Sequence, residues 1–129
     1  MLMASMMGAI AFQKDLGAVH SCAHALSTVN DLHHGLANGV MIDHVMRFNR
    51  EAASAKFEEL ARVAGVPDFV AWLTNLKDAI GIPPRLGPLG VRQEHVARLV
   101  EIAEKDICHQ TNPRPCTRED FKRLFQAAL

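Results

Sequence analysis

Histidines are concentrated in one short stretch of this 129-residue chain, where five of the seven lie between residues 20 and 44. Neutral imidazole is the commonest metal ligand among side chains, so chemistry should be sought here first. His20 and His24 are four residues apart, so on a helix both rings project from one face, where they can grip one ion or flank one cleft. The alternative for such an isolated pair is a purely structural role, because no carboxylate stands beside it.

A second pair of histidines, His33 and His34, follows ten residues later. His34 lies where a helix is expected to begin, and the residues after it include Gly35, Ala37 and Gly39. Small residues beside an imidazole leave room for a ligand or cofactor. We therefore expect His34 to be the chemically important member of the pair, and His33 to lie at the surface or to support its neighbours.

The other histidines and one cysteine have simpler interpretations. His44 falls on an apolar helix stripe, which favours a buried, hydrogen-bonded role. His95 and His109 have no ligand set nearby and are predicted to face solvent. Cys22 lies on the opposite side of the helical turn from His20 and His24 and is predicted to pack in the core.

Composition excludes several classes of function. Fourteen basic residues balance fourteen acidic ones and aromatic residues are few, so a nucleic-acid partner is not expected. The three cysteines are odd in number and form no Cys-x-x-Cys pair, which excludes a disulfide framework and favours a reducing cytoplasm. The apolar stretch 1–12 lacks a basic leader and is too short to span a bilayer, so no membrane association is expected.

Apolar spacing predicts an all-α multi-helix bundle that forms a single domain over residues 1–129, with no strand alternation anywhere. The prolines and glycines of residues 81–90 predict a loop, and Thr117 with Asp120 resembles a capping box. Phe57, Phe69 and Trp72 are predicted to be core residues. Besides a helix in residues 1–12, the expected helices are 19–27, 34–48, 51–64, 67–80, 93–108 and one that begins after residue 117.

The first expected helix has no Ser, Thr, Asp or Asn before it to cap its free amide groups. We therefore expect that residues which normally precede this segment are missing, the alternative being a native N-terminal helix that frays. Lys14, just after this helix, is expected to be solvated, with contact to a cofactor phosphate as the alternative.

Three motifs stand out: Gly17-x-x-His20-x-x-x-His24, His34-Gly35-x-x-Asn38 and His44-Val45-Met46-Arg47-Phe48-Asn49, with later landmarks at residues 82–91 and 112–120. Taken together, they resemble the signature of the iron-containing alcohol dehydrogenases, and the resemblance spans the whole chain. Proteins of this family have an N-terminal α/β domain that binds NAD or NADP and a C-terminal helical domain that carries a metal. This chain resembles only the later part of the second domain.

The resemblance implies a site. In the family one Asp and three His hold the metal, usually Fe²⁺ and sometimes Zn²⁺. By position, His20 and His34 match the last two ligands, while the other two would lie upstream of Met1. His24 matches a further, catalytic histidine that lines the cleft near the nicotinamide. Asp31 and Asp43 are candidates for a substitute carboxylate within this chain.

The expected function is that of the C-terminal part of an iron-dependent, NAD(P)-linked alcohol dehydrogenase that acts on a small alcohol or aldehyde. The segment alone is expected to lack a complete active site and to be inactive, and no residue is assigned to the cofactor. The alternative is a free-standing helical binding or oligomerisation module derived from that family, in which apolar residues of the first helix pair with another subunit.

Overall fold

The computed structural model describes residues 1–129 apart from the side chain of Lys14, so both expectations for that lysine fall outside what is described. Within the described residues every regular element is a helix and none is a strand, which confirms the all-α prediction. The α-helices are α1 (Leu2–Ala11), α2 (Ala18–Asn30), α3 (His34–Asn49), α4 (Ser54–Ala64), α5 (Phe69–Ala79), α6 (Val96–Lys105) and α7 (Arg118–Ala128).

The segment predicted as one helix over residues 93–108 is divided. A short 3₁₀ turn, η3 (Gln93–His95), precedes α6, and a second one, η4 (Ile107–Thr111), follows it. Asp106 has an extended backbone and its side chain accepts a hydrogen bond from the backbone N–H of Cys108, so it ends α6 and caps η4. Local side-chain capping therefore overrides the apolar periodicity on which the prediction rested.

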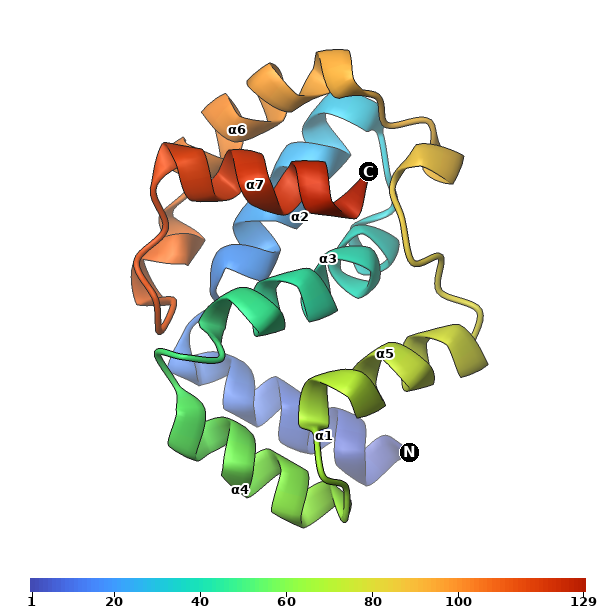
Figure 1. Ribbon diagram of the computed structural model, residues 1–129, viewed down its shortest axis with the longest axis vertical. Coiled ribbons are helices and arrows are strands. Elements are labelled where there is room, and N and C mark those ends of the chain that lie inside the picture. Colours follow the sequence, from blue (N-terminus) through green and yellow to red (C-terminus); the bar gives the residue numbers. More distant parts are fainter.

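The core lies among α2, α3, α6 and α7. Helix α2 packs against both α3 and α6, and α7 closes the bundle against α6 and α3 (Figure 1). Small side chains on α2 allow this close packing, since Ala18, Cys22 and Ala25 are completely buried. The packing role predicted for Cys22 is confirmed. The largest side chains of the core are Phe121 and Phe125 on α7.

Both ends of α7 are fixed by contacts outside the helix, the loop around Leu86 at its C-terminal end and a capping box at its start. Leu86, in the predicted loop, is completely buried and its N–H donates to the carbonyl of Ala128, which ties the loop to the end of α7. Within the same loop lies a short 3₁₀ turn, η2 (Gly87–Leu89). The capping box of Thr117 and Asp120 at the start of α7 is confirmed.

Helices α4 and α5 lie with α1 at the other end of the molecule (Figure 1). The ring centroids of Phe57 and Phe69 are 6.3 Å apart, and those of Phe69 and Trp72 are 5.5 Å apart. Trp72 remains 37% exposed, so these residues form a satellite aromatic cluster rather than part of the main core. The prediction that placed them in the core was wrong in this respect, because helical spacing identifies an apolar face but not what covers it.

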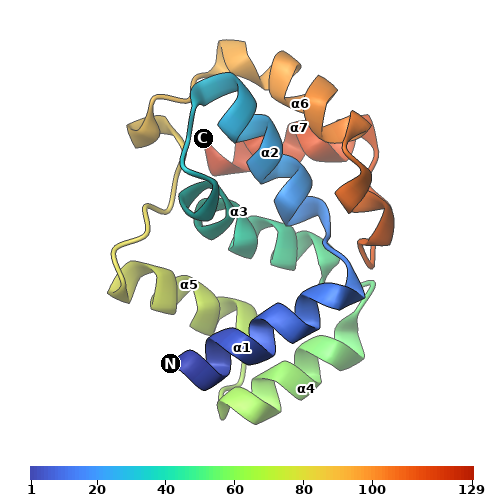
Figure 2. The same cartoon turned by 180° about the vertical axis from the view of Figure 1, so that it is seen from behind.

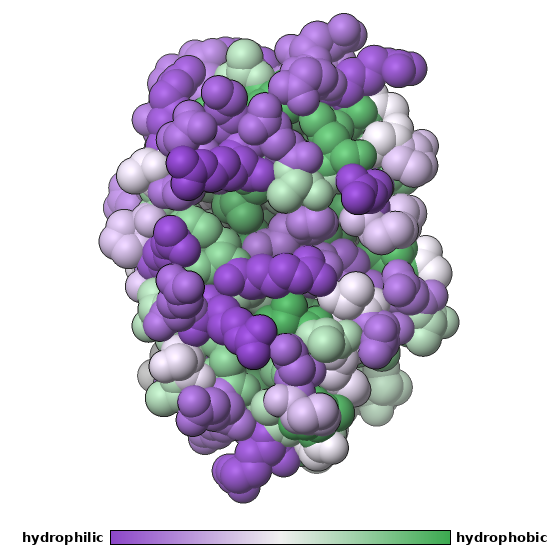
Figure 3. Space-filling model, in the orientation of Figure 1, coloured by the Kyte–Doolittle hydropathy of each residue, from purple (hydrophilic) through white to green (hydrophobic). Residues whose placement is uncertain are grey.

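Helix α1 contributes nothing to the core, since none of its residues is buried. It lies on the face seen in Figure 2, opposite the largely hydrophilic face of Figure 3. Its exposed apolar side chains, with those of the flanking residues, are Met1, Leu2, Met3, Met6, Met7, Ile10 and Phe12. Across the residues that the structure describes, no helix is long and apolar enough to cross a membrane.

Candidate metal centre

The start of α2 is fixed by a side chain from a distant segment. The N–H of Ala18 donates to Oδ1 of Asn112 at 3.2 Å, and the amides of Asn112 and Asn49 bind each other. A Cβ on Gly17 would lie only 3.1 Å from the same Oδ1, so the close approach favours glycine at this position. This anchor lies two residues before His20 and so fixes the helix that carries the first two histidines.

His20, His24 and His34 come together in the fold. Their ring centroids are 5.9 Å apart for His20 and His24, 5.3 Å for His20 and His34, and 5.2 Å for His24 and His34. The predicted shared face of His20 and His24 on α2 is confirmed. His34 is the first residue of α3, and it is brought back to α2 by a tight connection that begins at Asp31, whose φ of 53° is left-handed.

His33, the neighbour of His34, is not part of this cluster. Its residue is exposed, and its ring lies beside Gly35, where a Cβ would meet Cε1 of the ring at 3.3 Å. The surface position predicted for His33 is therefore confirmed.

The imidazoles are suited to metal binding. Burial lowers the pKa of His20, and the neighbouring His34 and His24 lower it further, against an opposing effect of Asp106. Nε2 of His34 accepts a hydrogen bond from Nδ2 of Asn38 at 3.0 Å, so a metal bound at this nitrogen would have to replace that hydrogen bond. Neutral imidazoles are good ligands for Fe²⁺ and Zn²⁺, and the donor set therefore fits either ion. Oδ1 of Asn38 is buried beside His34 without a hydrogen-bond partner.

Asp106 is the residue at this site that sequence reasoning missed. Its Oδ2 lies 2.8 Å from Nδ1 of His24, and its Oδ1 accepts hydrogen bonds from Oγ of Ser21 at 2.9 Å and from the N–H of Cys108 at 2.8 Å. Burial alone would raise the pKa of Asp106, but these hydrogen bonds outweigh it and hold the pKa at about 2. The sequence feature that could have revealed Asp106 is its position as an aspartate two residues before Cys108, where its side chain can cap the turn η4.

His24, Asp106 and Cys108 also have ligand atoms within 4.8 Å of one another. The carboxylate already accepts three hydrogen bonds. Burial and the adjacent Asp106 raise the pKa of Cys108 to about 11, so its sulfur is a protonated thiol. These three groups therefore form a hydrogen-bonded support for His24 rather than a second ligand set.

The two carboxylates suggested as substitutes lie elsewhere. Asp31 is exposed at the C-terminal cap of α2. Asp43 is buried and accepts hydrogen bonds from Lys77, Arg47 and Thr74, so its charge is already compensated. Asp43 is therefore not available to a metal at the histidine cluster.

The remaining histidines are structural. Nε2 of His44 is 3.5 Å from the carbonyl of Pro84 and the side chain is largely buried, as predicted. The prediction that His95 and His109 face solvent was wrong. Nδ1 of His95 is 2.8 Å from Nδ2 of Asn30, and the ring of His109 packs edge-on against Phe121. Both occupy the short turns that replace the ends of the predicted helix.

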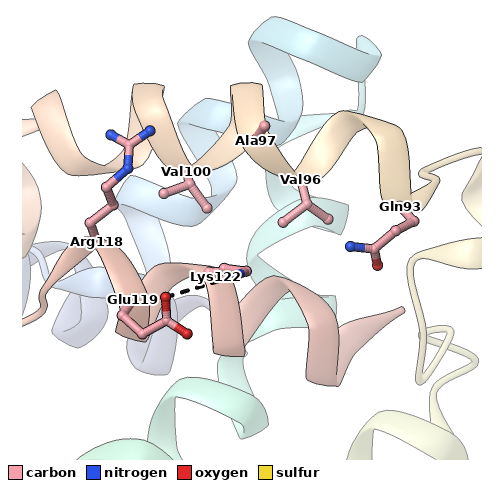
Figure 4. A pocket seen from close by; sticks show the side chains of 7 residues that line it. All are labelled: Gln93, Val96, Ala97, Val100, Arg118, Glu119 and Lys122. Carbon is pink, nitrogen blue, oxygen red and sulfur yellow. Dashed lines mark ion pairs between the residues drawn. The ribbon is translucent and has the colours of Figure 1, made fainter.

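Two grooves differ in their relation to the histidines. One, of about 530 Å³, adjoins His20 and is walled by apolar residues of α2, α3 and α4, including Val19, Ile42 and Phe57. The other, of about 420 Å³, lies between α6 and α7, where Figure 4 shows Val96 and Val100 of α6 across from the charged side chains of α7. No histidine lines the second groove, so the first is the one associated with the candidate metal centre.

Comparisons with known proteins identify the family of this chain. The model for "Fe-containing alcohol dehydrogenase family, C-terminal" matches residues 1–129, and the chain therefore belongs to this family. Lactaldehyde reductase of Escherichia coli K12 is 36% identical, over 88% of this chain and 32% of that protein. The chain spans about a third of the length of such relatives.

Solved structures show the same helical arrangement. The alcohol dehydrogenase from Oenococcus oeni superposes with a TM-score of 0.82 at 30% identity, over 88% of this chain and 33% of that one. The sulfoacetaldehyde reductase from Bifidobacterium kashiwanohense, solved in complex with NAD⁺, gives a TM-score of 0.76 at 26% identity, over 87% of this chain and 30% of that one. The family resemblance predicted from the sequence is confirmed.

Proposed function

We propose that this chain is the metal-binding part of an iron-dependent, NAD(P)-linked alcohol dehydrogenase that interconverts a small alcohol and its aldehyde. The observation that carries the proposal is the convergence of His20, His24 and His34 within 5.9 Å of one another in a chain of this family. Lactaldehyde reductase and sulfoacetaldehyde reductase, two of its relatives, are named for aldehyde substrates. The free cysteines favour the cytoplasm as its compartment.

In this proposal His20 and His34 hold the metal, and His24 lines the cleft beside it. When bound, Fe²⁺ or Zn²⁺ supplies Lewis-acid polarisation of an alcohol oxygen, and the nicotinamide of NAD or NADP accepts the hydride. The residues of this chain contribute by holding the three histidines in position. Asn112 fixes α2, the connection after Asp31 returns His34 to it, and an apolar groove adjoins His20.

Zinc and iron titration of the purified chain tests the ligand assignment. Two imidazoles without the other family ligands should bind Zn²⁺ weakly, and His20→Ala or His34→Ala should each reduce the affinity by roughly tenfold or more. His33→Ala is the matched control, since His33 is exposed and adjacent to His34 but outside the cluster, and it should leave the affinity unchanged. Equal Zn²⁺ affinity in wild type, His20→Ala and His34→Ala would contradict the assignment.

The second candidate function is an oligomerisation module, favoured by the exposed apolar side chains of α1. Sedimentation velocity over a wide concentration range separates the two. A stable dimer that Ile10→Glu dissociates, and that Val63→Glu on α4 leaves intact, would support the module. A monomer at all concentrations would remove this candidate.

A further inference from the structure

The pair formed by His24 and Asp106 points to a role for the carboxylate that the family signature does not assign. We propose that Asp106 is a positioning residue that holds His24 as the Nδ1–H tautomer and leaves its Nε2 as the hydrogen-bond acceptor at the three-histidine cluster. The role of that acceptor in catalysis rests on the proposed function, whereas the assignment of the tautomer is independent of it.

Asp106 is held firmly by groups other than His24. Its side chain is 17% exposed, and its Oδ1 accepts from the hydroxyl of Ser21 on α2 and from the N–H of Cys108 in η4. The extended backbone at Asp106 ends α6, and this places the carboxylate over α2. With both anchors on Oδ1, the second oxygen is left to face Nδ1 of His24 at 2.8 Å.

The chemistry of this contact determines the tautomer. An ionised carboxylate has no proton to give, so in the 2.8 Å contact Nδ1 of neutral His24 must be the donor. The proton on Nδ1 leaves a lone pair on Nε2, since a neutral imidazole carries only one N–H. The His24 ring is stacked on that of His34, with centroids 5.2 Å apart, and its centroid lies 5.9 Å from that of His20, so the Nε2 that carries this lone pair belongs to a ring of the cluster. In the proposed enzyme, Nε2 accepts a hydrogen bond from the substrate hydroxyl.

Asp106 also caps η4, and a purely structural role must be distinguished from positioning. The cap uses Oδ1 only, so Asp106→Asn can keep it through the amide oxygen. Because the N–H of Cys108 can only donate, the amide oxygen must face it, and the amide NH₂ then faces His24. An NH₂ group requires an acceptor, so Nδ1 of His24 must lose its proton and the N–H must move to Nε2.

Long-range ¹H–¹⁵N NMR spectra of the full, metal-free chain read the tautomer directly, at a pH about two units above the ordinary histidine pKa. We expect Nδ1–H for His24 in the wild type and Nε2–H in Asp106→Asn, with the His24 signals assigned from the spectrum of His24→Gln. Ser21→Ala is the matched control, since it removes a hydrogen bond from the same carboxylate but should leave His24 as Nδ1–H.

Two results would overturn the proposal: Nε2–H in the wild type, or Nδ1–H in a folded Asp106→Asn. If Asp106→Asn does not fold, the wild-type spectrum alone decides. The measurement uses no metal, so it is separate from the zinc titration. If the chain binds no Zn²⁺ but His24 is the Nδ1–H tautomer, the proposed ligand assignment is wrong and the proposed role of Asp106 stands.

Discussion

Asn49 and Asn112, sixty-three positions apart, bind each other through both side-chain amides. Nδ2 of Asn49 donates to Oδ1 of Asn112 at 3.0 Å, and Nδ2 of Asn112 donates to Oδ1 of Asn49 at 2.7 Å. Oδ1 of Asn112 also accepts from the N–H of Ala18. One buried amide thus joins the end of α3, the start of α2 and the segment before α7, so the helix with His20 and His24 begins at a fixed point.

Replacing Asn112 should therefore be costly. Asn112→Ala leaves the Asn49 amide and the Ala18 N–H buried and unpaired, which should destabilise the fold by about 2–4 kcal/mol. Asn49→Ala removes only the reciprocal pair and should cost less. Urea unfolding of both single variants and the double variant measures the coupling, and the double variant should cost less than the sum. Strict additivity would show that the two amides act independently.

The buried ion pair between α3 and α5 gives a second prediction. Nζ of Lys77 donates to the carbonyl of Val40 at 2.8 Å and to the carboxylate of Asp43, and both charged residues are almost fully buried. Asp43→Asn leaves the ammonium without its counter-charge and should cost about 3–5 kcal/mol.

The matched variant for this pair is Lys77→Met, which leaves Asp43 with Arg47 and Thr74 and should cost less. The measurement is the free energy of unfolding in urea for both variants. A larger loss in Lys77→Met than in Asp43→Asn would show that Lys77 acts mainly by packing its aliphatic chain.

Acid should weaken the fold through Asp106. The pKa of this carboxyl is held at about 2 in the folded protein, below its ordinary value of 3.8. A depressed carboxyl pKa contributes stability that is fully present above about pH 5 and is lost as the pH falls toward about 2. Asp106→Asn has no such proton to bind, so its stability should fall less than that of the wild type between about pH 6 and pH 3.

Unfolding free energies at these two pH values test the acid dependence. Asp78→Asn, at an exposed carboxyl on α5, is the control and should keep the wild-type dependence. Identical acid dependence in the wild type and Asp106→Asn would mean that Asp106 has an ordinary pKa in the folded chain.

The cysteines should differ in reactivity toward a thiol reagent. Cys22 is completely buried in α2, and burial raises its pKa, whereas Cys108 and Cys116 are partly exposed and have pKa values raised to about 11. We expect slow labelling of Cys108 and Cys116 in the native chain and labelling of Cys22 only in denaturant, as followed by mass spectrometry. Native labelling of Cys22 at the rate of the other two would contradict the tight packing of α2 against α3 and α6.

The sequence determined the features that depend on neighbours within a few residues. The apolar spacing fixed the class of fold, the four-residue step placed His20 and His24 on one face, and Thr117 with Asp120 set the start of α7. The family motif was also readable, because it consists of residue types at fixed local steps.

Only the tertiary structure decided which distant groups meet. His34 joins the other two histidines because the chain turns back after Asp31, and Asp106 reaches His24 across eighty-two positions because α6 packs on α2 and ends there. Periodicity predicted one helix through Asp106 and so hid this carboxylate. Apolar patterning records which face of a helix is covered, but the partner on that face is chosen by packing of the whole chain, and no local pattern contains it.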